Sequence, residues 1–142
     1  MTVRALLPAL AIVVTSSAAH ACGYCIEDRM AAVYDHQVMT RAAASGHRIA
    51  FFAVQGPQIT DSATARAIRR DVERVAGVDR GSVRYSGDLA ALSLSFDPRA
   101  TPYGALDRAL GKTLGARGLG LGLINIVEHP SQIRAGRTTA VR

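Results

Sequence analysis

The chain has 142 residues, a length that suits one domain and leaves little room for two. Its hydrophobic content is 49%, which is typical of a packed core and excludes a disordered polymer. The formal net charge is +6, but the arginines are scattered among acidic residues and are not interleaved with aromatics, so we expect a solvated surface and no nucleic-acid interface.

Residues 1–21 have the pattern of a cleaved bacterial signal peptide. Arg4 supplies a positive start, Leu6 to Val14 is an apolar run, and a small-residue region ends at Ala21. The run is far shorter than the ~20 residues that a membrane-spanning helix needs, and no other stretch reaches that length. Cleavage after Ala21 makes Cys22 the mature N-terminus, whereas a cut two residues earlier leaves His20 there. We expect a periplasmic or secreted protein, and His20 argues against a lipid anchor on Cys22.

Residues 22–46 predict one continuous helix at the start of the mature chain, ended by Gly46. Its apolar residues recur at helical spacing; they are Ile26, Met30, Val33, Tyr34 and Val38. His47 to Val54 then predicts a strand that is apolar on both faces, as in strands buried on two sides. Packed antiparallel to this strand, the helix covers the sheet face that the later helices leave open.

The rest of the chain predicts a helix, two strands joined by a tight turn, another helix and a last strand. The apolar positions that indicate them are Ala65, Ile68, Val72 and Val75; Val83 and Tyr85; Leu92, Leu94 and Phe96; Leu106, Leu110 and Leu114; and the run from Leu119 to Val127. Thr60 or Asp61 caps the first of these helices, and Thr101 caps the second, ahead of Pro102.

After the first helix, this order is strand-helix-strand-strand-helix-strand. It predicts an α+β protein with a ferredoxin-like βαββαβ antiparallel sheet, preceded by an extra helix. The tight turn at Gly87 excludes a doubly wound sheet, because parallel neighbours need a crossover. We therefore predict a single domain over residues 22–128, with its core at 47–128, and a flexible tail over 129–142.

Residues from about Arg48 to Glu128 resemble heavy-metal-associated domains. The motifs that carry the resemblance are Gly77-Val78, Leu94-Ser95-Phe96-Asp97-Pro98, Thr101 and Leu106. The resemblance implies a ferredoxin-like fold and the binding of a soft metal ion. That family carries its Cys-x-x-Cys motif in the loop after the first strand. Here the loop is Gln55-Gly56-Pro57-Gln58, so the family's ligands do not transfer to it.

The two cysteines lie instead at the start of the extra helix, as Cys22-Gly23-Tyr24-Cys25. A helix of about 20 residues is ~30 Å long and a strand of eight is ~26 Å. An antiparallel pair of these lengths brings Cys22 and Cys25 back to the end of the first strand, the corner where the related family keeps its metal loop.

The spacing of Cys22 and Cys25 places two thiols on one side of a helical turn. A helix N-terminus and the nearby Arg29 favour thiolates, which bind soft ions. Two sulfurs suffice for Cu(I), whereas Zn(II) takes about four ligands. We predict Cys22 and Cys25 as ligands of Cu(I), or of Zn(II), in metal handling or resistance. Another periplasmic protein is the second expected partner, and we expect no enzyme.

Two other functions remain open. The four-residue motif matches the active site of some thioredoxin-fold disulfide isomerases, which supports a dithiol redox protein, although the strand that precedes the motif in that fold is missing here. A ligand-free interaction domain is the other alternative. Among the histidines, His36 is expected to be a surface or packing residue, because eleven residues along the same helix put it too far from Cys25 to share a metal ion. His47 and His129 are expected near each other, at the opposite end of the sheet from the cysteines.

Overall fold

The computed structural model describes residues 25–128, which form one four-stranded antiparallel sheet with the strand order β2-β3-β1-β4. The elements in chain order are α1 (Ile26–Ala32), α2 (His36–Ser45), β1 (Arg48–Gln55), α3 (Ser62–Glu73), β2 (Arg84–Ser86), β3 (Ala91–Phe96), α4 (Tyr103–Gly115) and β4 (Gly120–Val127). From β1 onward this is the βαββαβ order, so the predicted ferredoxin-like α+β fold is confirmed. The predicted tail, 129–142, and signal peptide lie outside the described residues.

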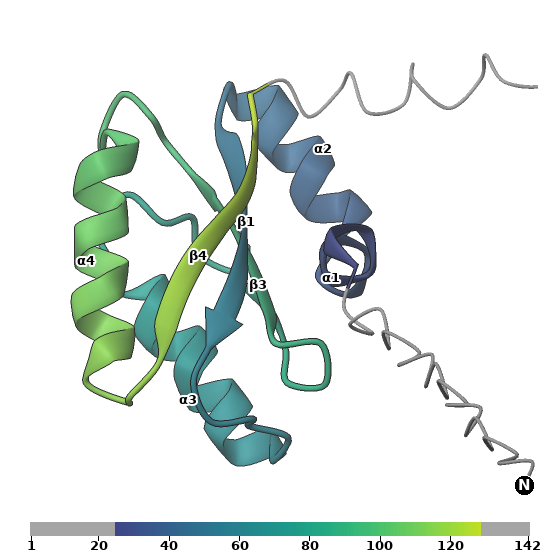
Figure 1. Ribbon diagram of the computed structural model, residues 1–142. Helices are drawn as coiled ribbons and strands as arrows, with labels where there is room; N and C mark the ends of the chain where they lie inside the picture. The colour runs from purple at the N-terminus through teal and green to yellow at the C-terminus, as the bar shows by residue number, and fades with distance from the viewer. Residues whose placement is uncertain (1–24, 129–142) are drawn as a thin grey trace, which may run out of the picture.

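The sheet is the middle layer of three, with α3 and α4 on one face and α1 and α2 on the other (Figure 1). Each face has its own apolar core. The larger core, beneath α3 and α4, is built on Ala50, Phe52, Val54, Ile68, Val72, Leu92, Leu94, Phe96, Leu106, Leu110 and Leu114. The smaller core, beneath α1 and α2, contains Val33, Val38, Met39, Ala42, Ile49, Phe51 and Ala91. The first strand is therefore buried on both faces, as its sequence predicts.

The prediction of one continuous helix over 22–46 is wrong, because the chain turns between α1 and α2. Asp35 has an extended backbone, and its carboxylate accepts hydrogen bonds from the backbone N–H groups of Gln37 at 2.8 Å and Val38 at 3.1 Å. This is an N-cap, which starts a new helix where the apolar spacing suggested the middle of one. Arg84 of β2 pairs with the same carboxylate at 2.7 Å and fixes the turn against the sheet.

The turn also changes which side chains are buried. Val33 is 3% exposed and Val38 is 4% exposed, in agreement with the predicted stripe. Ile26 is 62% exposed and Tyr34 is 47% exposed, so these two predictions of burial are wrong. The apolar spacing in the sequence continues across Asp35, but the chain turns there and a new helix begins. The apolar residues before and after Asp35 therefore do not lie on one continuous helix face.

The other helix ends follow the sequence with one exception. Asp61 caps α3 through a 2.8 Å bond from the Thr64 N–H, as predicted. Thr101 does not cap α4, because Pro102 itself occupies the N-cap with an extended backbone. The Thr101 side chain instead packs against Gly77, where an added Cβ would lie 2.4 Å from the Thr101 hydroxyl.

Burial at the turn between α1 and α2 gives a first prediction. Val33→Asp places an unpaired charge in the smaller core, so we expect it to lower the free energy of unfolding by about 3 kcal/mol or more. Tyr34→Asp changes the neighbouring, exposed side chain, so we expect a change within about 0.5 kcal/mol. Chemical denaturation of both variants measures this, and equal losses would show that α1 and its turn are not docked as described.

A second prediction concerns the acid dependence of the Asp35 cap. Its pKa is held below the usual value, first by the Val38 N–H bond and then by Arg84. A lowered folded-state pKa means that the stabilisation is present above about pH 4 and is lost as the pH falls through the folded-state value. We expect Asp35→Ala to cost about 1 to 2 kcal/mol at pH 7, with the difference from the wild type shrinking under acid.

The matched control is Asp35→Asn, which keeps an oxygen for the cap and loses the charge opposite Arg84. We expect it to cost less than Asp35→Ala at pH 7. Urea denaturation at pH 7 and at pH 3 measures all three proteins. A deficit in Asp35→Ala that is the same at both pH values would contradict the assigned role of the carboxylate.

Candidate functional site

Cys25 is the residue from which α1 begins. Its backbone carbonyl accepts a 3.2 Å bond from the Arg29 N–H, and its side chain makes no capping hydrogen bond. The thiol is free and exposed. Cys22, the other predicted ligand, lies outside the described residues, so the pairing of the two thiols stays a prediction.

Helix α1 is attached to the sheet through its C-terminal end. The Ser93 hydroxyl on β3 donates a 2.7 Å bond to the Val33 carbonyl, and Met30 packs against the smaller core. Ser93 pairs with Phe51, so the attachment lies over the middle of β1. The expected approach of the cysteines to the loop at 55–58 was based on an unbroken helix, and that premise is wrong. The approach itself stays a prediction, because Cys22 lies outside the described residues.

The first turn of α1 also carries the acidic residues Glu27 and Asp28, both exposed. Within residues 25–128, no group of three or more His, Cys, Asp and Glu side chains is arranged to hold a metal ion. A closed four-ligand zinc site of the structural type is therefore not present in that part of the chain. For a site with fewer ligands on Cys25, the predicted second ligand is Cys22, which lies outside the described residues.

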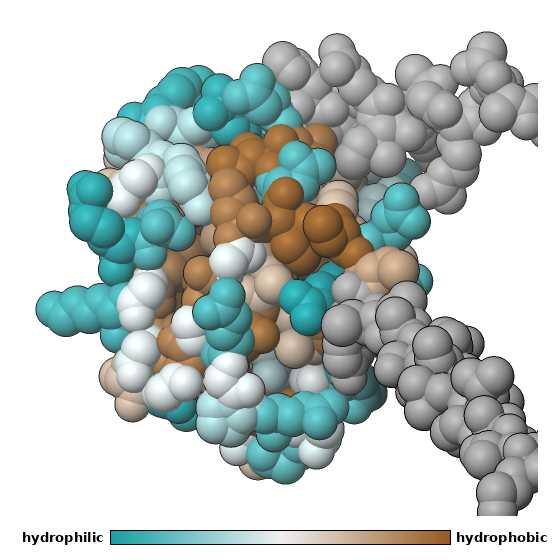
Figure 2. Space-filling view, in the orientation of Figure 1, coloured by the Kyte–Doolittle hydropathy of each residue, from teal (hydrophilic) through white to brown (hydrophobic). Residues whose placement is uncertain are grey.

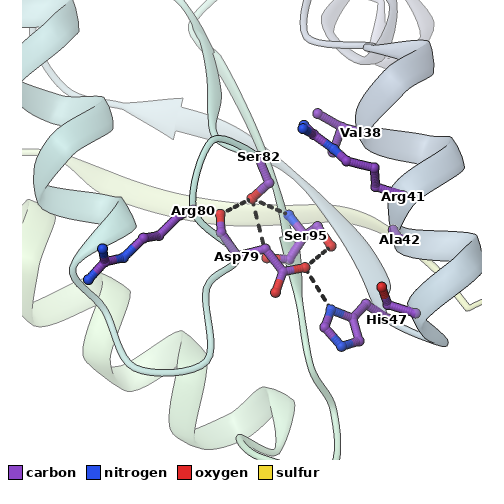
Figure 3. A pocket seen from close by; sticks show the side chains of 9 residues that line it. Val38, Arg41, Ala42, His47, Asp79, Arg80, Ser82 and Ser95 are labelled. Carbon is purple, nitrogen blue, oxygen red and sulfur yellow. Dashed lines mark hydrogen bonds and ion pairs between the residues drawn. The ribbon is translucent and has the colours of Figure 1, made fainter.

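A polar cleft of about 190 Å³ lies between the end of α2 and the loop after α3 (Figure 3). His47 stands just before β1, and its Nδ1 lies 2.7 Å from an Asp79 carboxylate oxygen. The Ser95 hydroxyl on β3 donates to the same oxygen. The Ser82 hydroxyl donates to the Asp79 carbonyl at 2.6 Å and accepts from the Ser95 N–H at 3.0 Å.

These bonds determine what the cleft can do chemically. Ser95 and His47 both bond to the carboxylate and not to each other, so the three residues do not form a nucleophile–base–acid relay. The network instead ties the loop that carries Asp79 to β3 and to the start of β1. We read the cleft as a structural clasp, a network that holds this loop against the sheet.

The described residues give His47 acidic neighbours that the sequence did not predict. His129, its expected neighbour, lies outside the described residues. The observed second neighbour is Asp97, whose carboxylate is 3.8 Å from His47 Nε2. The pKa of Asp97 is lowered, first by a bond from the Arg99 N–H and in small part by His47. Pairing of Arg48 with Phe96 puts His47 beside Asp97, so strand register is the signal that would have found it.

His36 is the first residue of α2 and is exposed, as predicted. The reason given from the sequence, a long separation from Cys25 along one helix, does not hold, because Asp35 starts a new helix between them.

Over residues 25–128, none of the helices combines the length and apolarity needed to cross a bilayer.

Comparison with known proteins found no matching family model and no matching curated protein. Among solved structures, oxidized MerP from Ralstonia metallidurans CH34 is similar with 20% identity and a TM-score of 0.41, over 53% of this chain and 93% of that protein. A copper-binding domain from HMA7, a P-type ATPase, is similar with 15% identity and a TM-score of 0.44, over 56% of this chain and 96% of that domain. Both TM-scores are below 0.5, so the fold assignment rests on this chain's own strand order and pairing.

The clasp gives a third prediction. Asp79→Ala leaves His47 and the Ser95 hydroxyl without their acceptor, so we expect a loss of about 1 to 3 kcal/mol in the free energy of unfolding. Asp88→Ala, at an exposed position of the β2–β3 turn, is the control and changes stability by less than about 0.5 kcal/mol. Chemical denaturation of the two variants measures the difference, and an unaffected Asp79→Ala would refute the clasp.

Proposed function

We propose that this chain is an exported protein that binds one soft metal ion through the thiolates of Cys22 and Cys25, with Cu(I) as the preferred ion. The observation that carries the proposal is the position of Cys25 on an exposed first turn, with a thiol that is not used in the fold. The ion is cargo, held for handling or resistance.

Exposure of the Cys25 thiol suits such a role. A structural cysteine is usually buried and inert, whereas a ligand that loads and releases an ion must be reachable. Ile26, next to it, is 62% exposed, so the surface beside Cys25 on this side is open as well. Cys22 precedes Cys25 by three residues, a spacing that lets two thiolates share one ion.

The preference for Cu(I) follows from the number of available donors. Thiolates select soft ions such as Cu(I), and two of them suffice for one. Zn(II) prefers four ligands, and residues 25–128 supply no group of three suitable side chains. Zinc would need donors such as Glu27 or Asp28 together with groups from outside this range, so it is the second candidate.

A dithiol redox protein is the competing function, since the same two thiols can close into a disulfide in an oxidising compartment. The two functions differ in what the purified protein contains. Intact mass measurement of exported protein, purified without reductant, distinguishes a metal adduct, a disulfide that has lost two hydrogen atoms, and a bare dithiol. The same measurement gives the mature N-terminus, expected at Cys22.

The fourth prediction tests the ligands. Competition with a Cu(I) chelator compares the reduced wild type with Cys22→Ser, Cys25→Ser and His36→Ala at matched concentrations. We expect each cysteine variant to lose at least about tenfold in affinity, equivalent to about 1.4 kcal/mol. His36→Ala is the matched control, an exposed soft-metal donor on the next helix, and should bind as the wild type does.

Two outcomes would overturn the proposal. If both cysteine variants bind Cu(I) as tightly as the wild type, the ion is held elsewhere. If the wild type binds no ion but reduces or isomerises a disulfide substrate, the redox function replaces metal binding. Asp79→Ala, which alters the clasp and not the motif, serves as a second control for indirect effects of destabilisation.

A further inference from the structure

Helices α3 and α4 carry a surplus of positive charge that the rest of the described chain lacks. Residues 61–74 and 103–117, which comprise these helices and their ends, contain seven cationic and four acidic residues. The other described residues contain six cationic and seven acidic residues. Cations that look scattered in the sequence are thus gathered by the fold on one side of the sheet, opposite α1 and α2 (Figure 1).

Five cationic side chains of these helices form no ion pair and no side-chain hydrogen bond within residues 25–128. They are Arg66, Arg69, Arg70, Arg108 and Lys112. The nearby carboxylates are held by other donors: Asp71 by Arg74 and Arg117, Glu73 by the Gly81 N–H, Asp107 by the Tyr103 hydroxyl, and Asp61 by the Thr64 N–H. The positive charge of the five is therefore not balanced by an ion pair.

A groove of about 500 Å³ lies between the two helices. Arg74 lines it from the end of α3, and Lys112 lines it from α4. Each of these cations follows another exposed cation by four residues, Arg70 on α3 and Arg108 on α4, so the positive charge continues along both walls. The other lining residues are Asp71, whose carboxylate is bound to two arginines, and the small or neutral Val75, Ala76, Ala109 and Thr113.

We propose that this groove docks an acidic segment of a partner protein. Glutamate and aspartate side chains of such a segment meet cations on both walls, while its backbone lies over the small side chains between them. The arginines of the α3 wall suit carboxylates, because a guanidinium group can donate two parallel hydrogen bonds. Charge complementarity identifies the occupant as anionic, and the concave shape identifies it as a chain that enters the groove.

The lack of apolar anchors on this face favours a protein segment over a lipid or nucleic-acid surface. The large hydrophobic side chains that are exposed within residues 25–128 are Ile26, Tyr34 and Leu123, and none of them belongs to α3 or α4. The two helices therefore lack the apolar side chains with which a surface helix enters a bilayer and the exposed aromatic rings on which bases stack. Figure 2 shows mostly hydrophilic or neutral residues on the side where Figure 1 draws α4.

The groove and the cysteine-bearing end lie on different faces of the sheet. Helices α3 and α4 pack over the larger core, whereas α1, which follows Cys25, packs over the smaller core. A partner docked in the groove leaves the exposed Cys25 thiol uncovered. Docking is therefore independent of metal binding and can be tested without it.

The test measures the binding of a fluorescently labelled poly-glutamate peptide to the purified full chain, as processed on expression. Fluorescence anisotropy with a chelator present gives the affinity. We expect saturable binding at low ionic strength that weakens as salt is added, because exposed charges are screened. In NMR spectra, the amide signals that shift on binding should belong to residues 70–76 and 108–113.

Lys112→Glu reverses one cation of the groove, and we expect it to weaken peptide binding about fivefold or more. Arg41→Glu is the matched control, because Arg41 is an exposed cation on α2, on the other face of the sheet, and the change in net charge is the same. We expect the control to change the affinity by less than about twofold. Thermal unfolding of both variants checks that each remains folded.

Equal losses of affinity in the two variants would mean that only net charge matters and would overturn the proposal. It would also be overturned if the peptide does not bind at low ionic strength, or if the shifted amides lie outside the groove. Vesicles of phosphatidylglycerol test the other anionic surface. If they bind, and Lys112→Glu weakens that binding while the peptide does not bind, the face is a membrane surface and the partner-protein assignment is wrong.

Discussion

The burial of β1 on both faces is the constraint on which the rest of the structure depends. Ile49 and Phe51 point to one side of the sheet and Ala50 and Phe52 to the other, and each is 2% exposed or less. Full burial of a side chain such as Ile or Phe stabilises by roughly 1.5 to 3 kcal/mol, so neither face of this strand can be left to solvent. The helices α3 and α4 cover one face, as in any βαββαβ sheet. The other face requires a second cover, and the N-terminal segment supplies it. The place of α1, and of the Cys25 thiol, is a consequence of that requirement.

The sequence predicts the core of this fold well because its signals are local. Strict alternation in Leu92, Leu94 and Phe96 and the helical spacing of Leu106 and Leu110 each specify one element, and all of these residues are fully buried. The break between α1 and α2 could not be predicted in the same way. An alanine-rich stretch with apolar spacing favours an unbroken helix, and the local Asp35 cap is joined by a pairing with Arg84, which is 49 positions away. Pairing over that distance overrides local propensity.

For the candidate sites, the sequence shows which residue types can act, but it does not show which side chains surround them. The cysteine motif is evident from two residue types at one spacing, and the exposure of Cys25 agrees with it. The acidic neighbours of His47 were not predicted, because the strand ends were matched without a register, and the expected neighbour His129 lies outside the described residues. Asp97 follows from the pairing of β1 with β3, once that register is known. Asp79 does not follow from any pattern, since its position depends on how the loop between α3 and β2 folds back onto Ser82 and Ser95.

Helix α1 contributes no buried residue of its own to the domain. Its attachment includes the partly buried Met30 and the bond from Ser93 to the Val33 carbonyl, at the very end of the helix. Protein segments with so few apolar contacts open locally at a free energy far below that of global unfolding. We therefore expect the seven residues that follow Cys25 to open at a lower free energy than the core. Local opening of this helix, with the sheet intact, would widen the distance over which the Cys25 thiol can reach.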